Sequence, residues 1–137
     1  MSPMAMLLVE DNLADVVFFR EAAHAARLDA KVEVVSNGED AMRFLRRQGP
    51  YAQSDRPDIL VLDLNLPMRN GREVLVEMAA DPDLREIPVA VLTTSISETH
   101  VVSAYTPGLC TYFVKTDEFK RLQDIVRQIA AHAAAHA

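Results

Sequence analysis

The sequence lacks several features that would identify other classes of protein. Its single cysteine, Cys110, cannot form an internal disulfide, which agrees with a reducing compartment. No apolar run approaches the roughly 18 residues of a membrane span, and the N-terminus shows no export signal. Positive charge is in deficit, with 14 Lys and Arg against 20 Asp and Glu, so the net charge of −6 disfavours nucleic-acid binding. We therefore expect a cytoplasmic protein that binds neither membranes nor nucleic acids.

The length and composition are those of one globular domain. A chain of 137 residues can bury one hydrophobic core but is too short for two ordinary domains. Half of the residues are apolar and 25% are charged, which excludes a disordered chain. We expect a single domain over residues 1–137, with no output domain after the last helix.

Five short apolar segments alternate with longer segments of helical period. The apolar segments are residues 5–9, 32–35, 58–62, 88–92 and 110–114. The first, third and fourth are apolar on both faces, as expected of strands that helices cover on either side. Lys31 and Glu33 mark the second segment as an edge strand. The alternation predicts a (βα)₅ fold of the α/β class with a parallel sheet.

The segments between the predicted strands carry signals for helix ends. The candidate N-cap residues are Asn12, Asn37, Ser97 and Thr116. We expect the second helix to stop near Gly49-Pro50 and the third to span residues 71–80. The fourth is expected to end at Pro107-Gly108, and the fifth to begin at the Thr116 cap.

Polar residues occur where four of the predicted strands end, which is where open α/β sheets bind ligands. Glu10 and Asp11 follow the first strand, the third strand ends at Asp63, the fourth ends at Thr93-Thr94, and Lys115 follows the fifth. Two carboxylates ~4 Å apart repel each other by about 4 kcal/mol at an effective dielectric constant of ~20. A hard divalent cation relieves that repulsion, and Mg²⁺ is the usual one beside phosphate. With a lysine and a hydroxyl nearby, Asp63 is a plausible nucleophile for a phosphoryl group.

These five residues and their order resemble the CheY-like receiver domain of two-component response regulators. The resemblance runs from Met6 to about Ala133. It implies a doubly wound, flavodoxin-like sandwich with strand order 2-1-3-4-5. It also implies a protein that a histidine kinase phosphorylates in a Mg²⁺-dependent reaction. Such a protein signals by conformational switching and partner binding, and catalyses only its own phosphorylation and dephosphorylation.

The resemblance implies a role for each residue of the expected metal site. Asp63 would accept the phosphoryl group and would also contact Mg²⁺. Asp11 would bind the metal directly, Glu10 through a water molecule, and Asn65 through its backbone carbonyl.

Three further residues take roles by the same resemblance. Thr93 would be the switch hydroxyl, Tyr112 its aromatic partner, and Lys115 the residue that contacts the phosphate. Receiver domains commonly have proline after this lysine, reached through a cis peptide, whereas Thr116 stands here. Because a cis bond to a non-proline residue costs roughly 2.5–4 kcal/mol, the sequence leaves the isomer of this peptide open.

Longer local motifs resemble the stand-alone regulators of bacterial phytochrome histidine kinases. The motifs are Leu8-Val9-Glu10-Asp11-Asn12, Leu62-Asp63-Leu64-Asn65-Leu66-Pro67, Gly71-Arg72-Glu73-Val74-Leu75 and Pro88-Val89-Ala90-Val91-Leu92-Thr93-Thr94-Ser95. A phytochrome-type kinase is therefore the expected partner. A homodimer is also expected, through the predicted fourth helix, the last strand and the fifth helix, with Tyr105 and Leu109 among the residues of an apolar patch.

Two other functions use related folds. A phosphohydrolase of the haloacid-dehalogenase type also has a strand-end aspartate nucleophile, but there it is the first residue of an Asp-x-Asp motif whose second carboxylate acts as general acid. Asp63-Leu64-Asn65 has an amide in place of the general acid. A flavin carrier needs a Ser/Thr/Gly-rich phosphate loop after the first strand, where Glu10-Asp11-Asn12 would repel phosphate. The Gly-x-x-x-x-Gly-Lys-Ser/Thr loop of a GTPase is absent.

Overall fold

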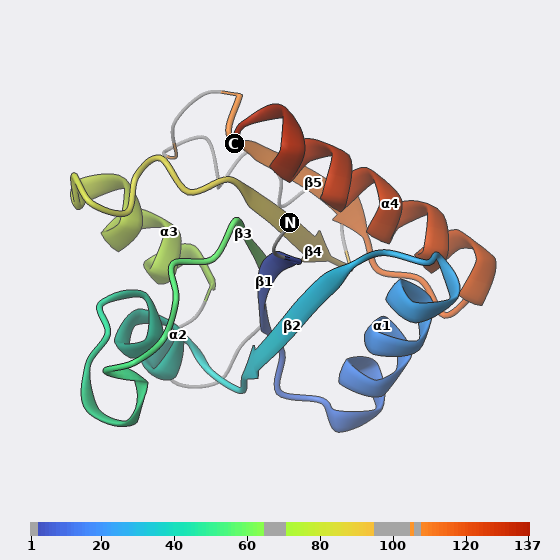
Figure 1. Cartoon of the computed structure of the whole chain (residues 1–137), viewed down its shortest axis with the longest axis horizontal. Coiled ribbons are helices and arrows are strands. Elements are labelled where there is room, and N and C mark those ends of the chain that lie inside the picture. The colour runs from blue at the N-terminus through green and yellow to red at the C-terminus, as the bar shows by residue number, and fades with distance from the viewer. Residues whose placement is uncertain (1–2, 65–70, 95–104, 106–107) are drawn as a thin grey trace.

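A computed structural model describes residues 3–64, 71–94, 105 and 108–137. Within these residues, five parallel strands form one sheet in the order β2-β1-β3-β4-β5 (Figure 1). The elements are β1 Met4–Val9, α1 Leu13–Ala25, β2 Ala30–Val35, α2 Gly38–Leu45, the short 3₁₀ helix η1 Gly49–Tyr51, β3 Ile59–Asp63, α3 Gly71–Ala80, β4 Val89–Thr93, β5 Cys110–Val114 and α4 Phe119–Ala135. The predicted α/β class and strand order are confirmed.

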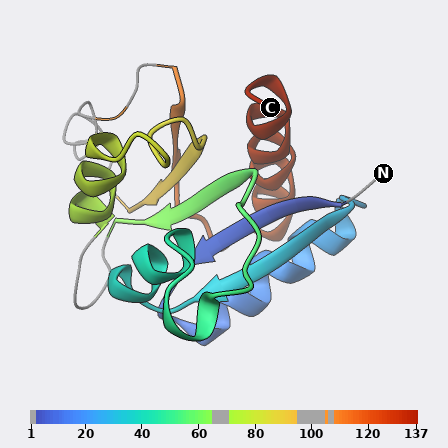
Figure 2. The same cartoon turned by 60° about the vertical axis from the view of Figure 1, so that its left-hand side comes forward.

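Helices cover both faces of the sheet, and each face has its own hydrophobic cluster (Figure 2). Alternate residues of a strand point to opposite faces. Leu7, Leu60 and Val89 accordingly pack on the side of α2 and α3, whereas Leu8 and Val61 pack on the side of α1 and α4. All residues of β3 and β4 are buried, as their two-sided apolar pattern predicts. None of the helices in the described ranges is long and apolar enough to cross a membrane.

The edge strand and the first two helix starts follow the sequence. β2 lies at the edge of the sheet, where Lys31 and Glu33 form an exposed ion pair of 3.1 Å. The side-chain oxygens of Asn12 and Asn37 accept backbone N–H bonds of 3.2 and 2.8 Å in the first turns of α1 and α2. Both asparagines are therefore confirmed as N-caps.

Two predicted helix ends are wrong. α2 ends at Leu45, before the predicted stop near Gly49-Pro50, because Arg47 takes a left-handed conformation with φ 55°. α4 begins at Phe119, and Thr116 is not its cap. The hydroxyl of Thr116 instead accepts the N–H of Glu118 at 3.1 Å, which closes a local turn ahead of the helix.

The predicted fourth helix, with its Ser97 cap, falls outside the described residues apart from Tyr105. The Lys115–Thr116 peptide bond, which the sequence left open, is trans.

Gly71 joins the end of β3 closely to the start of α3. A Cβ atom on this residue would lie 2.8 Å from the carbonyl oxygen of Asp63 and 2.8 Å from the Cα of Leu64. Real Cβ atoms do not approach backbone this closely. Glycine at this position therefore lets α3 begin against the backbone of the residue that the sequence identifies as the nucleophile.

Candidate functional site

Three carboxylates gather beyond the carboxyl ends of the two central strands. Glu10 and Asp11 follow β1, Asp63 ends β3, and these strands pair directly, with Val9 opposite Leu62. One carboxylate oxygen from each of the three residues lies within 4.8 Å of the others. The prediction that residues 52 positions apart in the chain meet at this edge is confirmed, since 63 − 11 gives 52.

Lys115 crosses the rim of the sheet and neutralises part of this charge. Its ammonium lies 2.9 Å from Oε1 of Glu10 and 2.9 Å from Oδ2 of Asp63. Oδ2 of Asp15, on the first turn of α1, lies 3.5 Å away. The backbone N–H of Lys115 donates to the carbonyl of Thr93 at 2.8 Å, which fixes the end of β5 beside the end of β4.

Burial makes this a strongly perturbed electrostatic site. Glu10 and Asp63 are each only 4% exposed. Burial raises the pKa of Glu10 to about 7, although its bond to Lys115 and the backbone N–H of Asn12 act in the opposite direction. Burial lowers the pKa of Lys115, but its hydrogen bonds to Asp63 and Glu10 outweigh that effect and leave the pKa above its ordinary value.

The donor set fits a hard divalent cation. The three residues offer only carboxylate oxygens, which Mg²⁺ and Mn²⁺ accept readily. Glu10 and Asp63 are buried, whereas Asp11 is exposed, so one side of the cluster is open to water. That geometry suits an ion that keeps part of its hydration shell. Asn65, the fourth predicted ligand, lies outside the described residues.

Thr93 and Tyr112 lie on one face of the sheet. Thr93 is 1% exposed at the end of β4 and is in register with Val114. It shares the face of Val89 and Val91, on the side of α2 and α3, because side chains alternate along the strand. Tyr112 is partly buried against that same cluster. Their roles as switch residues stay predictions.

Tyr105 does not contribute to an exposed apolar patch as expected. It is 3% exposed, and its hydroxyl lies 2.6 Å from the carbonyl oxygen of Ile87 and 3.1 Å from that of Leu84. The tyrosine thus fixes the chain ahead of β5 to the connection between α3 and β4. Sequence reasoning missed this role because tyrosine in an apolar segment gives no signal for a hydroxyl partner that lies far away in the chain.

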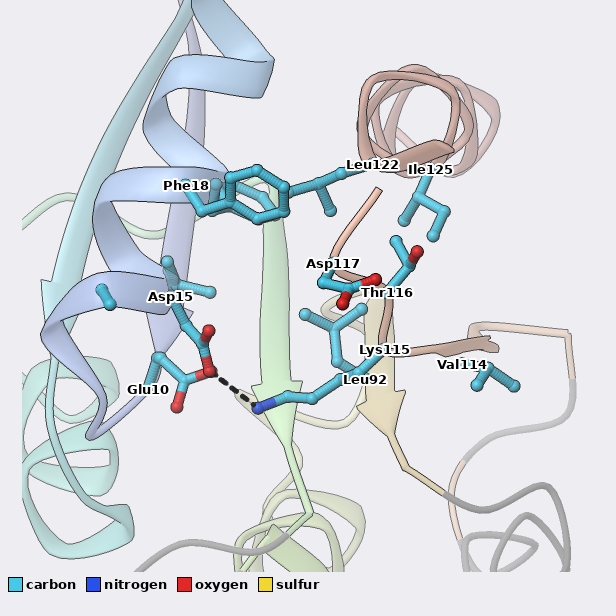
Figure 3. A pocket seen from close by; sticks show the side chains of 13 residues that line it. Glu10, Asp15, Phe18, Leu92, Val114, Lys115, Thr116, Asp117, Leu122 and Ile125 are labelled. Atoms are coloured by element: carbon cyan, nitrogen blue, oxygen red, sulfur yellow. Dashed lines mark hydrogen bonds and ion pairs between the residues drawn. The ribbon is translucent and has the colours of Figure 1, made fainter. Parts of the chain in front are cut away.

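A pocket of about 510 Å³ lies between α1 and α4 beside the lysine (Figure 3). Its apolar wall includes Phe18 and Leu122, and Glu10, Asp15 and Lys115 provide polar groups at one end. Asp15 was not among the predicted site residues, since an acidic residue in a first helical turn usually reflects the helix dipole alone.

Comparisons with known proteins agree with this geometry. The family model described as "Response regulator receiver domain" matches residues 6–127. "Response regulator Rcp1" of Synechocystis is 42% identical over 127 residues, which cover 93% of this chain and 86% of that protein. The structure of the "Phosphorylated Cyanobacterial Phytochrome Response Regulator RcpA" matches with a TM-score of 0.85 and 38% identity, covering 98% of this chain and 96% of that one. The "Mn(2+)-bound form of response regulator Rcp1" matches with a TM-score of 0.80 and 39% identity, covering 94% and 93%.

Proposed function

The chain belongs to the response regulator receiver domain family and is related to phytochrome response regulators, and from this premise we propose that it accepts a phosphoryl group on Asp63. The donor would be a histidine kinase, of the phytochrome type in view of these relatives. The observation that carries the proposal is the ammonium of Lys115, 2.9 Å from a buried aspartate within a cluster of three carboxylates. The relationship gives no support to the haloacid-dehalogenase alternative.

We propose Mg²⁺ as the cation of this cluster. Glu10, Asp11 and Asp63 would hold it, with Asn65 contributing a backbone carbonyl. When bound, the ion would offset the negative charge of the incoming phosphoryl group and of the carboxylates around it. The Mn²⁺ form of a relative supports a divalent ion here.

Three residues of the chain would take part in the phosphoryl transfer. A carboxylate oxygen of Asp63 forms the new bond to phosphorus while the P–N bond of the donor phosphohistidine breaks, and the imidazole leaves with the electron pair of that bond. Lys115 is already at hydrogen-bond distance from this carboxylate, so its ammonium can donate hydrogen bonds to the phosphoryl oxygens once the group is attached. The buried Thr93 offers a hydroxyl at the neighbouring strand end.

Phosphorylation would then be read out by partner proteins. It adds about two negative charges at the rim, and we propose that Thr93 moves toward them and that Tyr112 responds on the same face. The surface that changes would include β5 and α4, and a second copy of the chain would bind there; the predicted fourth helix, also expected in this surface, lies outside the described residues. A cytoplasmic location follows from this proposal, since the kinase takes its phosphate from ATP.

Intact mass spectrometry after incubation with acetyl phosphate tests the acceptor. Wild type should gain the mass of one phosphoryl group only when Mg²⁺ is present, and Asp63→Asn should gain none. Asp55→Asn, which alters an exposed aspartate outside the cluster, is the matched control and should behave as wild type. Uptake by Asp63→Asn would overturn the assignment. So would the absence of uptake by wild type from both acetyl phosphate and a phosphorylated phytochrome-type kinase.

A further inference from the structure

The ammonium of Lys115 contacts one more carboxylate than the metal cluster accounts for. Within the part of the chain that the structure describes, its three acidic partners are Glu10, Asp63 and Asp15. Glu10 and Asp63 belong to the cluster that can hold a cation, whereas Asp15 does not. The lysine therefore shares two partners with the metal and has one of its own.

Asp15 is held in place from two sides. Its backbone N–H donates to the side chain of the N-cap residue Asn12, so the first turn of α1 fixes its position. From there the carboxylate faces the ammonium across one end of the pocket (Figure 3). Its side chain is 49% exposed, so its pairing with the lysine carries little cost of burial. The lysine side chain is only 23% exposed, so its charge needs an acidic partner more than the charge of Asp15 needs a basic one.

A divalent cation in the cluster would change the partners of the lysine. Glu10 and Asp63 would direct oxygen atoms at the ion, and two positive groups would then compete for the same two carboxylates. Asp15 lies next to the ammonium and outside that competition. Building on the proposed function, we propose that Asp15 is a positioning residue that holds Lys115 beside the site when a divalent cation occupies the carboxylate cluster.

The proposal predicts a specific coupling between Asp15, Lys115 and metal affinity. Without the Asp15 carboxylate, the lysine has to stay on Glu10 and Asp63 or lose its acidic partners altogether, so the cation binds less tightly. For a partly exposed ion pair we expect the dissociation constant for Mg²⁺ or Mn²⁺ to rise about three- to fivefold in Asp15→Asn. Asp15→Glu, which keeps the charge, should recover most of the affinity.

A double-mutant cycle separates this role from a general effect of charge. Lys115→Met and Lys115→Met/Asp15→Asn should bind Mn²⁺ with equal affinity, because Asp15 acts through the lysine. Asp117→Asn is the matched control, since Asp117 lines the same pocket but is not one of the described partners of Lys115. It removes the same charge and should leave the affinity within twofold of wild type.

Isothermal titration calorimetry with Mn²⁺ or Mg²⁺ alone gives these dissociation constants without a phosphodonor. Thermal unfolding of each metal-free variant shows whether its fold is retained. Equal losses in Asp15→Asn and Asp117→Asn would overturn the proposal, as would an undiminished effect of Asp15→Asn in the Lys115→Met background. Failure of phosphoryl uptake, read by mass, would instead count against the proposed function and would leave the metal cycle interpretable.

Discussion

The crowded carboxylates predict that the site lowers the stability of the metal-free protein. Asp11 lies within 4.8 Å of the carboxylates of both Glu10 and Asp63, measured between carboxylate oxygens. Among the described contacts, Lys115 forms ion pairs with Glu10 and Asp63 but not with Asp11. Replacing Asp11 by Asn keeps the shape of the side chain and removes one charge from two repulsive pairs. The variant should therefore unfold less readily than wild type when no cation is bound.

The size of the effect follows from the distance. At ~4.8 Å, each pair repels by about 3.5 kcal/mol for an effective dielectric constant of ~20, and by about 0.9 kcal/mol for the dielectric constant of water. Asp11 is exposed while its two neighbours are buried, so the true value lies between these limits. For the two pairs together, with most of the repulsion screened by solvent, we expect Asp11→Asn to raise the free energy of unfolding by about 2–3 kcal/mol.

Urea denaturation with EDTA and with excess Mg²⁺ measures the free energy of unfolding of the metal-free and the metal-bound protein. A pH of about 8 keeps Glu10 ionised, since its pKa is raised to about 7. Asp11→Asn should be more stable than wild type in EDTA, whereas Mg²⁺ should stabilise wild type and have little effect on the variant. Asp55→Asn, an exposed change outside the cluster, should alter neither value by more than about 0.5 kcal/mol. An Asp11→Asn protein less stable than wild type in EDTA would refute the reasoning.

Four other predictions concern residues at the site and elsewhere in the fold. Gly71→Ala should cost about 1–3 kcal/mol and weaken Mg²⁺ binding, because its Cβ would lie 2.8 Å from backbone atoms. Gly49→Ala, at φ +57° in open space, should cost about 1–2 kcal/mol and leave Mg²⁺ binding intact, and equal Mg²⁺ affinities in the two variants by calorimetry would contradict this. Tyr105→Phe should lower stability by about 1 kcal/mol in urea denaturation, since two buried carbonyls lose its hydroxyl, and unchanged stability would count against this anchor. Burial raises the pKa of Cys110 to about 11, so iodoacetamide at pH ~8 should alkylate the folded thiol on the order of 100-fold more slowly than the unfolded one, and comparable rates would exclude this. Burial also raises the pKa of Glu10 from 4.5 to about 7, so metal-free stability should fall as pH rises through that range, and a Glu10→Gln protein with the same fall would show that another group causes it.

The fold could be predicted because its central strands carry an unambiguous pattern. Residues of β3 and β4 are buried on both faces, and such continuous apolar segments between helical ones indicate a parallel sheet. The ends of elements were less predictable. The end of β3 at Asp63 was predicted and is confirmed, but the start of α4 at Phe119 was not, because the Thr116 hydroxyl closes a turn ahead of the helix instead of capping it. α2 ends early because Arg47 adopts a positive φ that sequence reasoning assigns to glycine.

The site could be predicted to the extent that strand ends determine it. Glu10, Asp11, Asp63 and Lys115 converge because parallel strands present their carboxyl ends at one edge, whatever the length of the connections. Asp15 could not be predicted in this way, because its contact with the lysine depends on the reach of two side chains from different elements. The role of Asn65 and the predicted fourth helix stay predictions.

The charge of the described site explains why one modification could reorganise it. Above the pKa of Glu10, three carboxylates and Lys115 sum to −3 + 1 = −2. A divalent cation brings that sum to zero, so the cation and the lysine together balance the acids. The proposed phosphorylation of Asp63 would replace a charge of −1 by about −2 and return the site to about −1. Glu10 and Asp11 would hold the cation and Asp15 would compete for the lysine, so the new charge would need one more donor. Thr93, buried at the next strand end, is the predicted hydroxyl donor, and its movement toward the phosphoryl group would alter the packing on the face of the sheet that it shares with Tyr112.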